Sequence, residues 1–337
     1  MHIVVTGATG RIGSALMRTL ADDPRVRSVT GIARRVASRS AHKVYYVSAD
    51  VAEEPLAPLF QGADVVVHLA WQFHPEKRPD ELWSTNVLGS RRVFDAVRQA
   101  GVPRLVYASS FAAYAPRDGV TPVDETFATT GSSTSLHARH KAEVERRLDE
   151  FEARYEGFRI ARLRPVATLA PAPASHIVER LTGSFPASAI DEAVLRLAAQ
   201  LARTPVQIAH SRDVAEAFRL AATDDVRGAF NIVPRAPLAD DDVSSGASSV
   251  MSKAASLALR FRLSRRDQNL VELAERAPLL DGTRAGRLLG YSPEYTTEEV
   301  LAEALCGLRK VTDRTPDGLW TKRPTAQLSN SAHVSVQ

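Results

Sequence analysis

Short apolar runs alternate with amphipathic segments along the first half of the chain. The runs that predict β-strands read HIVVTG, VTGIAR, VYYVSA, DVVVHLA, RLVYASS and FRIARLRP, and helical patterns lie between most of them. Strands separated by helices in this way form parallel sheets. The pattern predicts a doubly wound α/β fold, in which ligands bind beyond the carboxyl ends of the strands.

Two segments have the clearest helical periodicity. Residues 81–100 carry an apolar stripe and are stopped by Gly101 and Pro103. Residues 135–154 contain oppositely charged pairs spaced four apart, which predicts that these pairs lie on the exposed face of the helix. The pairs are Lys141 with Glu145, Glu143 with Arg147, and Arg146 with Glu150.

The pattern changes after Pro165, where ATLAPAPASH indicates a boundary loop. Beyond it we expect a helix over 190–203, a strand over 206–209 and a helix over 212–223. A Ser/Asp/Ala-rich stretch over 238–249 predicts a flexible excursion, and the polar, aperiodic residues 311–337 predict a flexible tail.

Composition narrows the function classes. The chain has 337 residues, 44% apolar and 24% charged, which is ordinary for a globular protein. Its single cysteine, Cys306, cannot form an intramolecular disulfide, and we expect an inert thiol in a cytoplasmic protein. No run approaches the roughly 20 apolar residues of a membrane helix. The net charge of +4 comes mostly from arginines that are scattered along the chain, and the histidines and acids do not have the spacing of metal ligands. We therefore expect neither a membrane, nucleic acid nor a metal as a partner.

The strongest motif opens the chain. VVTGATGRIGSAL places Gly7, Gly10 and Gly13 between a strand and a helix. There the helix amides and dipole favour a phosphate, and glycines let the backbone approach it. The motif predicts a Rossmann-type dinucleotide site, in which Thr9, Arg11 and Ile12 share the binding turn.

The glycine spacing after Thr6 resembles that of the extended short-chain dehydrogenase/reductase superfamily, in its epimerase/dehydratase-like branch. VSADVAE, HLA, NVLGS, YASSFAAY, RLRP and VQIAHSRDVAEAF follow in the family's order, and the resemblance covers about residues 1–310. It implies that Asp50 and Val51 approach the adenine, that Leu69 and Ala70 line the cofactor and that Pro165 lies beside the nicotinamide. It also implies Asn86 as the family's helix asparagine, Ser110 as the catalytic serine and Lys141 as the ribose-binding lysine.

The resemblance also implies a domain plan. Residues 1–168, completed by about 206–232, would bind the dinucleotide, whereas 169–205 and 233–310 would form a smaller, mostly helical substrate region. The two long helices would pair across a homodimer interface.

Cofactor choice can be argued physically. Enzymes that prefer NAD place an acid at the end of the second strand, but GIARR puts Ala33 there. Arg34, Arg35 and Arg11 can offer charge-assisted hydrogen bonds to a 2′-phosphate. We therefore expect NADP(H) rather than NAD(H).

The segment TSLHARHKAEVE departs from the resemblance. His137 stands four residues before Lys141, where the family has its catalytic tyrosine. Three interpretations stay open. His137 performs the acid/base work as a neutral imidazole; the reaction is a non-redox lyase, isomerase or cyclase step; or His137 is inert and the protein only binds a nucleotide.

Other residues could contribute to the site. Tyr114 follows Ser110 by four positions and is a candidate proton donor. Trp71 and Phe73 could form an apolar wall of the substrate site. His74 is a weaker candidate, and His140 is expected to be structural. The sequence predicts an NADP-dependent oxidoreductase or epimerase/dehydratase-like enzyme for a small carbonyl or alcohol metabolite.

Overall fold

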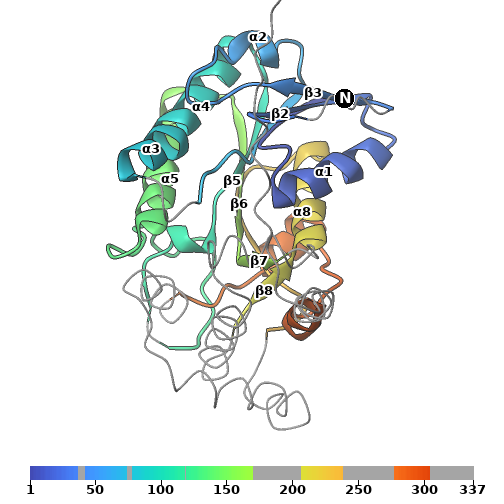
Figure 1. Ribbon diagram of the computed structural model, residues 1–337. Helices are drawn as coiled ribbons and strands as arrows, with labels where there is room; N and C mark the ends of the chain where they lie inside the picture. Colours follow the sequence, from blue (N-terminus) through green and yellow to red (C-terminus); the bar gives the residue numbers. More distant parts are fainter. Residues whose placement is uncertain (37–41, 74–77, 118, 170–205, 238–276, 304–337) are drawn as a thin grey trace, which may run out of the picture.

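The computed structural model describes residues 1–36, 42–73, 78–117, 119–169, 206–237 and 277–303 (Figure 1). Several predictions concern other parts of the chain. The helix over 190–203, the excursion over 238–249, the tail over 311–337, His74 and Cys306 all lie outside the described residues.

A parallel sheet forms the centre of the molecule. In the described ranges it has seven strands in the order β3-β2-β1-β4-β5-β6-β9, and each neighbouring pair is parallel. This arrangement confirms the predicted doubly wound fold. The strands are β1 His2–Thr6, β2 Ser28–Ala33, β3 Val44–Ser48, β4 Val65–His68, β5 Arg104–Ala108, β6 Arg159–Pro165 and β9 Gly228–Ile232.

Helices cover both faces of the sheet. α1 and α8 lie on one face, and α3, α4 and α5 lie on the other (Figure 1). Alternate strand residues face opposite sides, so Ile3 and Val5 pack in the core with Phe218 of α8, whereas Val4 packs with Leu148 of α5. The helices are α1 Arg11–Asp22, α2 Ala57–Phe60, α3 Pro79–Trp83, α4 Gly89–Gln99, α5 Leu136–Arg154 and α8 Ser211–Thr223.

The helix predicted over 81–100 is a composite. α3 runs into a π-helical turn, Ser84–Leu88, and then into α4. Such single π turns are frequent at functional sites, and this one contains Asn86. The helix predicted over 135–154 is confirmed as α5, and the Ser135 side chain caps its amino terminus by accepting from the Ala138 amide at 3.3 Å.

One prediction for α5 is wrong. The pairs Glu143–Arg147 and Arg146–Glu150 do form ion pairs on the helix surface, but Lys141 is only 4% exposed and Glu145 is fully buried. Spacing by four residues shows that two side chains share a face. It does not show whether that face meets water or the protein, and here Lys141 and Glu145 face the sheet side, where other elements supply their partners.

A short second sheet extends the molecule beyond β6. β7 Ala167–Leu169 pairs in parallel with β8 Ile208–His210, one to two residues later than the predicted strand. Gln207 bonds to both the amide and the carbonyl of Leu280, and these bonds tie residues 277–303 to the sheet. That segment contains a π turn, Ala285–Leu289. The domain boundaries stay a prediction.

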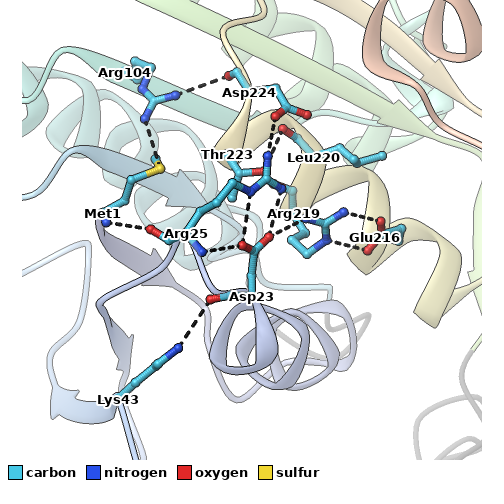
Figure 2. A network of polar contacts seen from close by, with 10 residues as sticks. All are labelled: Met1, Asp23, Arg25, Lys43, Arg104, Glu216, Arg219, Leu220, Thr223 and Asp224. Atoms are coloured by element: carbon cyan, nitrogen blue, oxygen red, sulfur yellow. Dashed lines mark hydrogen bonds and ion pairs between the residues drawn. The ribbon is translucent and has the colours of Figure 1, made fainter.

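The opposite end of the molecule is closed by a network of charged groups (Figure 2). The Asp23 carboxylate, just after α1, accepts from Arg25 Nε at 3.1 Å and Nη2 at 2.9 Å, and also from Arg219 of α8. Arg25 in turn bonds to Asp224 at 2.7 Å. The network therefore fastens α1 to α8 at the end of the sheet away from the strand carboxyl termini.

Candidate active site

The strand order reverses between β1 and β4. The chain runs from β1 outward through β2 to β3 and then returns to β4, so the connections that follow β1 and β4 leave in opposite directions and form the crevice where such sheets bind ligands. Gly7 follows β1 with a φ of 74°. A Cβ on Gly7 would lie 2.7 Å from both the Ala70 amide nitrogen and the Leu69 carbonyl carbon. Only glycine fits this turn, which brings the two strand ends together.

The amino terminus of α1 lies beside this crevice. Its N-cap is Gly10, which supplies no side-chain cap. The amino end of a helix favours an anionic group, and no side-chain cap occupies this one. A Cβ on Gly13 would lie 2.3 Å from the Gly7 carbonyl oxygen, so α1 packs directly on the turn after β1, as it does where glycines let the backbone approach a pyrophosphate. Thr9 is exposed and Ile12 half-buried on the same turn. The residues present fit a dinucleotide.

β2 and β3 lie on one side of the crevice. Arg34 and Arg35 follow Ala33 and are exposed. Asp50 accepts from the Ala52 amide at 2.9 Å and lies 3.9 Å from Arg34 Nε, while Val51 beside it is buried. Arg11 donates to the Thr168 carbonyl at 3.2 Å, which links α1 to β7.

A buried polar chain crosses the floor of the crevice. Thr6 Oγ1 lies 2.7 Å from His68 Nδ1, and His68 Nε2 lies 3.0 Å from Ser90 Oγ. Because Ser90 donates its proton to the Asn86 carbonyl at 2.6 Å, it accepts from Nε2, and His68 must accept from Thr6 at Nδ1. Burial and then the Lys141 charge lower the pKa of His68 to about 3. The neutral imidazole of His68 thus connects β1 and β4 to the π turn through hydrogen bonds. The sequence alone did not reveal this role.

Asn86 fixes the loop after β4. Its Oδ1 accepts from the Gln72 amide at 2.7 Å, and its Nδ2 donates to the Gln72 carbonyl at 2.9 Å. Both bonds are buried. They hold the backbone next to Trp71, whose side chain lies against α5.

Trp71, His137 and Lys141 form one contact cluster. The Trp71 indole Nε1 donates to His137 Nδ1 at 3.2 Å, and Lys141 Nζ lies 3.5 Å from the centroid of the indole ring. Lys141 Nζ also donates to the carbonyl of Ala108, at the end of β5, at 2.7 Å. Phe73 meets His137 edge to face at 5.2 Å and is half exposed. The aromatic pair predicted from the sequence therefore lies against His137.

Burial sets the protonation of this cluster. Burial lowers the pKa of Lys141 to about 7, although Glu145 opposes the shift. Burial, Lys141 and His140 lower the pKa of His137 to about 3. His137 is therefore neutral at pH 7. Because its Nδ1 accepts from Trp71, its remaining proton is on Nε2.

Ser110 and Tyr114 have different surroundings. Ser110 caps a 3₁₀ turn, Phe111–Ala113, that packs against α5, and its Oγ accepts from the Ala112 amide at 3.2 Å. Tyr114 is 2% exposed; its hydroxyl donates to Asn231 at 2.7 Å and accepts from Arg164 at 2.9 Å. Burial raises the pKa of Tyr114 to about 12. The structure places its hydroxyl among these partners rather than beside His137.

Two further predicted residues, Pro165 and His140, are buried. Pro165 is buried at the end of β6. His140 is 2% exposed and meets Trp83 edge to face at 5.3 Å, as expected of a structural residue.

None of the helices that the structure describes is long and apolar enough to cross a bilayer.

The switch point, the glycine cradle and the lysine-bearing helix define a Rossmann-type dinucleotide-binding protein. Residues 3–232 match the model of the NAD dependent epimerase/dehydratase family, and the chain belongs to that family. Membership confirms the resemblance to the extended short-chain dehydrogenases/reductases. Whether His137 replaces the catalytic tyrosine stays a prediction.

Curated relatives match part of the chain. One is L-arabinose 1-dehydrogenase (NAD(P)(+)) of Haloferax volcanii, 35% identical over 110 residues, which are 32% of this chain and 41% of the relative. Another is UDP-glucose 4-epimerase of Mycolicibacterium smegmatis, 35% identical over 121 residues, which are 33% of this chain and 39% of the relative. The matched part thus spans about two fifths of each relative's length.

Solved structures share the fold. MoeE5 in complex with UDP-glucuronic acid and NAD has a TM-score of 0.66 and 24% identity, with 92% of this chain and all of that chain covered. UDP-glucose-4-epimerase from Stenotrophomonas maltophila, with bound NAD and formylated UDP-arabinopyranose, has a TM-score of 0.67 and 23% identity and covers 94% of this chain and all of its own.

Proposed function

We propose that this protein is an NAD(P)-dependent oxidoreductase or epimerase that acts on a hydroxyl or carbonyl carbon of a small metabolite. The cradle formed by Gly7, Gly13 and the uncapped start of α1 carries the proposal, because a side chain at either glycine would collide with backbone. The names of the relatives, an arabinose dehydrogenase and UDP-glucose epimerases, support a hydroxyl-bearing substrate. When bound, the nicotinamide would exchange a hydride with the substrate carbon.

The proposed roles follow from the positions of the side chains. Lys141, anchored on the Ala108 carbonyl, would hold the ribose and tune the site electrostatically. Ser110 accepts a backbone bond at Oγ, and its hydroxyl would donate to the substrate oxygen. His137 would donate from Nε2 to that oxygen, as neutral imidazoles do beside carbonyl groups. Tyr114 is left out of this scheme because its hydroxyl already both donates and accepts within the protein.

We propose NADP(H) as the preferred cofactor. Ala33 at the end of β2 leaves no acid to repel a 2′-phosphate, and the exposed Arg34 and Arg35 follow it. A fluorescence titration with NADPH and NADH tests this without a substrate. We expect at least a tenfold preference for NADPH, about 1.4 kcal/mol, which a double Arg34→Ala/Arg35→Ala variant should lose.

Arg91→Ala is the matched control for that titration, because Arg91 is an exposed arginine on α4 and not on the segment after β2. It should bind NADPH like the unchanged protein. Equal affinity for NADPH and NADH would refute the proposal that Arg34 and Arg35 select NADP(H). Failure to bind either cofactor would refute the proposed function itself.

A second candidate is a non-redox lyase, isomerase or cyclase on the same scaffold. The observation that favours it is the bond from Trp71 to His137 Nδ1, because a histidine held in this way is a poor substitute for a proton-donating tyrosine. Substrate turnover without transfer of deuterium from labelled NADPH would support this alternative. Cofactor binding without any turnover would instead support a nucleotide-binding protein.

We also propose a homodimer through α3, α4 and α5. Trp83 of α3 is 36% exposed and lies beside His140 and Arg147 of α5, so an apolar side chain marks this helical face. Sedimentation should show a dimer that Trp83→Glu weakens. A monomer at the same concentration for the unchanged protein would refute this assembly.

A further inference from the structure

We propose that Trp71 is a positioning residue that holds His137 as a fixed hydrogen-bond donor at Nε2 and prevents it from taking up a second proton at Nδ1. The inference rests on the proposed function in one respect, namely that His137 faces the substrate. The indole and imidazole rings are 5.6 Å apart and nearly perpendicular, at 87°, and Nε1 lies 3.2 Å from Nδ1. Since an indole nitrogen only donates, Nδ1 must be the unprotonated nitrogen of His137.

This bond restricts the chemistry of the imidazole. A histidine shuttles a proton when one ring nitrogen releases it and the other takes one up. Here the nitrogen that would take it up already accepts from Trp71, which does not ionise in water. His137 can therefore polarise a substrate oxygen from Nε2, but a second proton could enter only if the bond to Trp71 broke. In a carbonyl reduction the substrate oxygen would take its proton from water, which leaves as hydroxide, and the imidazole would keep its own.

Two sets of contacts limit the movement of Trp71, one at the adjoining backbone and one at the indole ring. Asn86 of the π turn bonds to both backbone groups of Gln72, the next residue. Lys141 Nζ lies against one face of the indole at 3.5 Å and is itself held by the Ala108 carbonyl. The indole consequently has little freedom to leave His137.

A second tryptophan–histidine pair, in which Trp83 of α3 meets His140 of α5, provides a matched control. Trp83 and His140 also meet edge to face, at 5.3 Å and 76°. Yet His140 Nδ1 has no hydrogen-bond partner among the described residues. Trp83→Phe therefore makes the same substitution beside a histidine of α5 without removing an indole hydrogen bond to that histidine.

In the part of the chain that the structure describes, two titratable groups affect the pKa of His137. Lys141 and His140, both on α5, act on its titration. Trp71 and Phe73, from the loop after β4, are uncharged. A change in the titration of His137 in Trp71→Phe can thus be assigned to the lost bond once Lys141 and His140 are followed in the same spectra.

The test is ¹⁵N NMR of the full-length labelled protein, with the His137 signals assigned by their loss in His137→Gln. We expect the Nε2–H tautomer and a scalar coupling between the Trp71 indole nitrogen and His137 Nδ1. In Trp71→Phe the coupling should vanish, and the pKa of His137 should rise by about one unit, because a bond to the neutral ring is lost. Trp83→Phe should leave the His137 signals unchanged.

A proton on Nδ1 in the unchanged protein would overturn the inference, as would a Trp71→Phe variant with the same His137 tautomer and titration. If that variant does not fold, the coupling in the unchanged protein decides alone. None of these readouts needs turnover. Failure to bind a cofactor alongside an intact coupling would therefore count against the proposed function and not against the role of Trp71.

Discussion

The loss of Glu145 should cost the fold much of its stability. Its side chain is fully buried and accepts hydrogen bonds from Ser109 Oγ at 2.5 Å and Arg162 Nη1 at 3.1 Å. Arg164 adds two bonds, from Nε at 2.8 Å and from Nη2 at 3.1 Å. Glu145 of α5 thereby neutralises two arginines of β6 beneath the candidate site.

Glu145→Ala would leave Arg164 buried, at 5% exposure, without its carboxylate partner, whereas Arg162 would keep its ion pairs with Asp149 and Glu152. Removing one partner of a buried ion pair costs about 3–5 kcal/mol, because the remaining charge is desolvated and uncompensated. For a chain of this size each kcal/mol lowers Tm by roughly 2 °C. The variant should therefore unfold about 6–10 °C below the unchanged protein.

The same carboxylate makes stability depend on pH. Burial raises the pKa of Glu145, but the bonds and charges of Arg164 and Arg162, with the bond from Ser109, bring it down to about 2. The unfolded chain titrates near 4.3 at this position, roughly the value of a free glutamate. The stabilising contribution is therefore complete above about pH 4.3 and is lost as pH falls toward 2.

Thermal unfolding followed by circular dichroism measures both effects. Glu150→Ala is the control, because Glu150 lies on the same helix, pairs with Arg146 and is 63% exposed; its Tm should hardly change. The difference in Tm between Glu145→Ala and the unchanged protein should also shrink between pH 4 and pH 2. Equal Tm values for Glu145→Ala and Glu150→Ala would refute the reasoning.

Two further predictions concern the two ends of the sheet. Gly13→Ala, whose Cβ would lie 2.3 Å from the Gly7 oxygen, should weaken NADPH binding at least tenfold, about 1.4 kcal/mol, because the start of α1 must shift. Gly286→Ala, with its nearest neighbour at 3.8 Å, should bind normally in the same fluorescence titration, and equal loss in both would contradict the cradle. Asp23→Ala removes the carboxylate that joins Arg25 to Arg219 (Figure 2) and should cost about 2 kcal/mol in urea unfolding at pH 7. Because the Arg25 bond, above all, lowers the pKa of Asp23, this contribution should fade below about pH 4, and a cost that persists unchanged in acid would exclude a charge-based role.

The sequence by itself determined the architecture and the nucleotide cradle. The strands and their parallel order follow from local periodicity, and Gly7, Gly10 and Gly13 specify a turn that few other residues could form. These are properties of neighbouring residues, so they can be read along the chain. The same holds for α5 and for its surface pairs Glu143–Arg147 and Arg146–Glu150.

Only the tertiary structure decided which charged and aromatic groups meet. Lys141 and Glu145 have the same spacing as the surface pairs, yet they are buried because the Ala108 carbonyl, the Trp71 ring and the arginines of β6 surround them. Trp71 and His137 bond across 66 positions of sequence, and the hydroxyl of Tyr114 bonds to Asn231 across 117. A helical pattern fixes which side chains share a face. The identity of the groups packed against that face, and hence its polarity and chemistry, depends on contacts that form only when distant strands and loops come together.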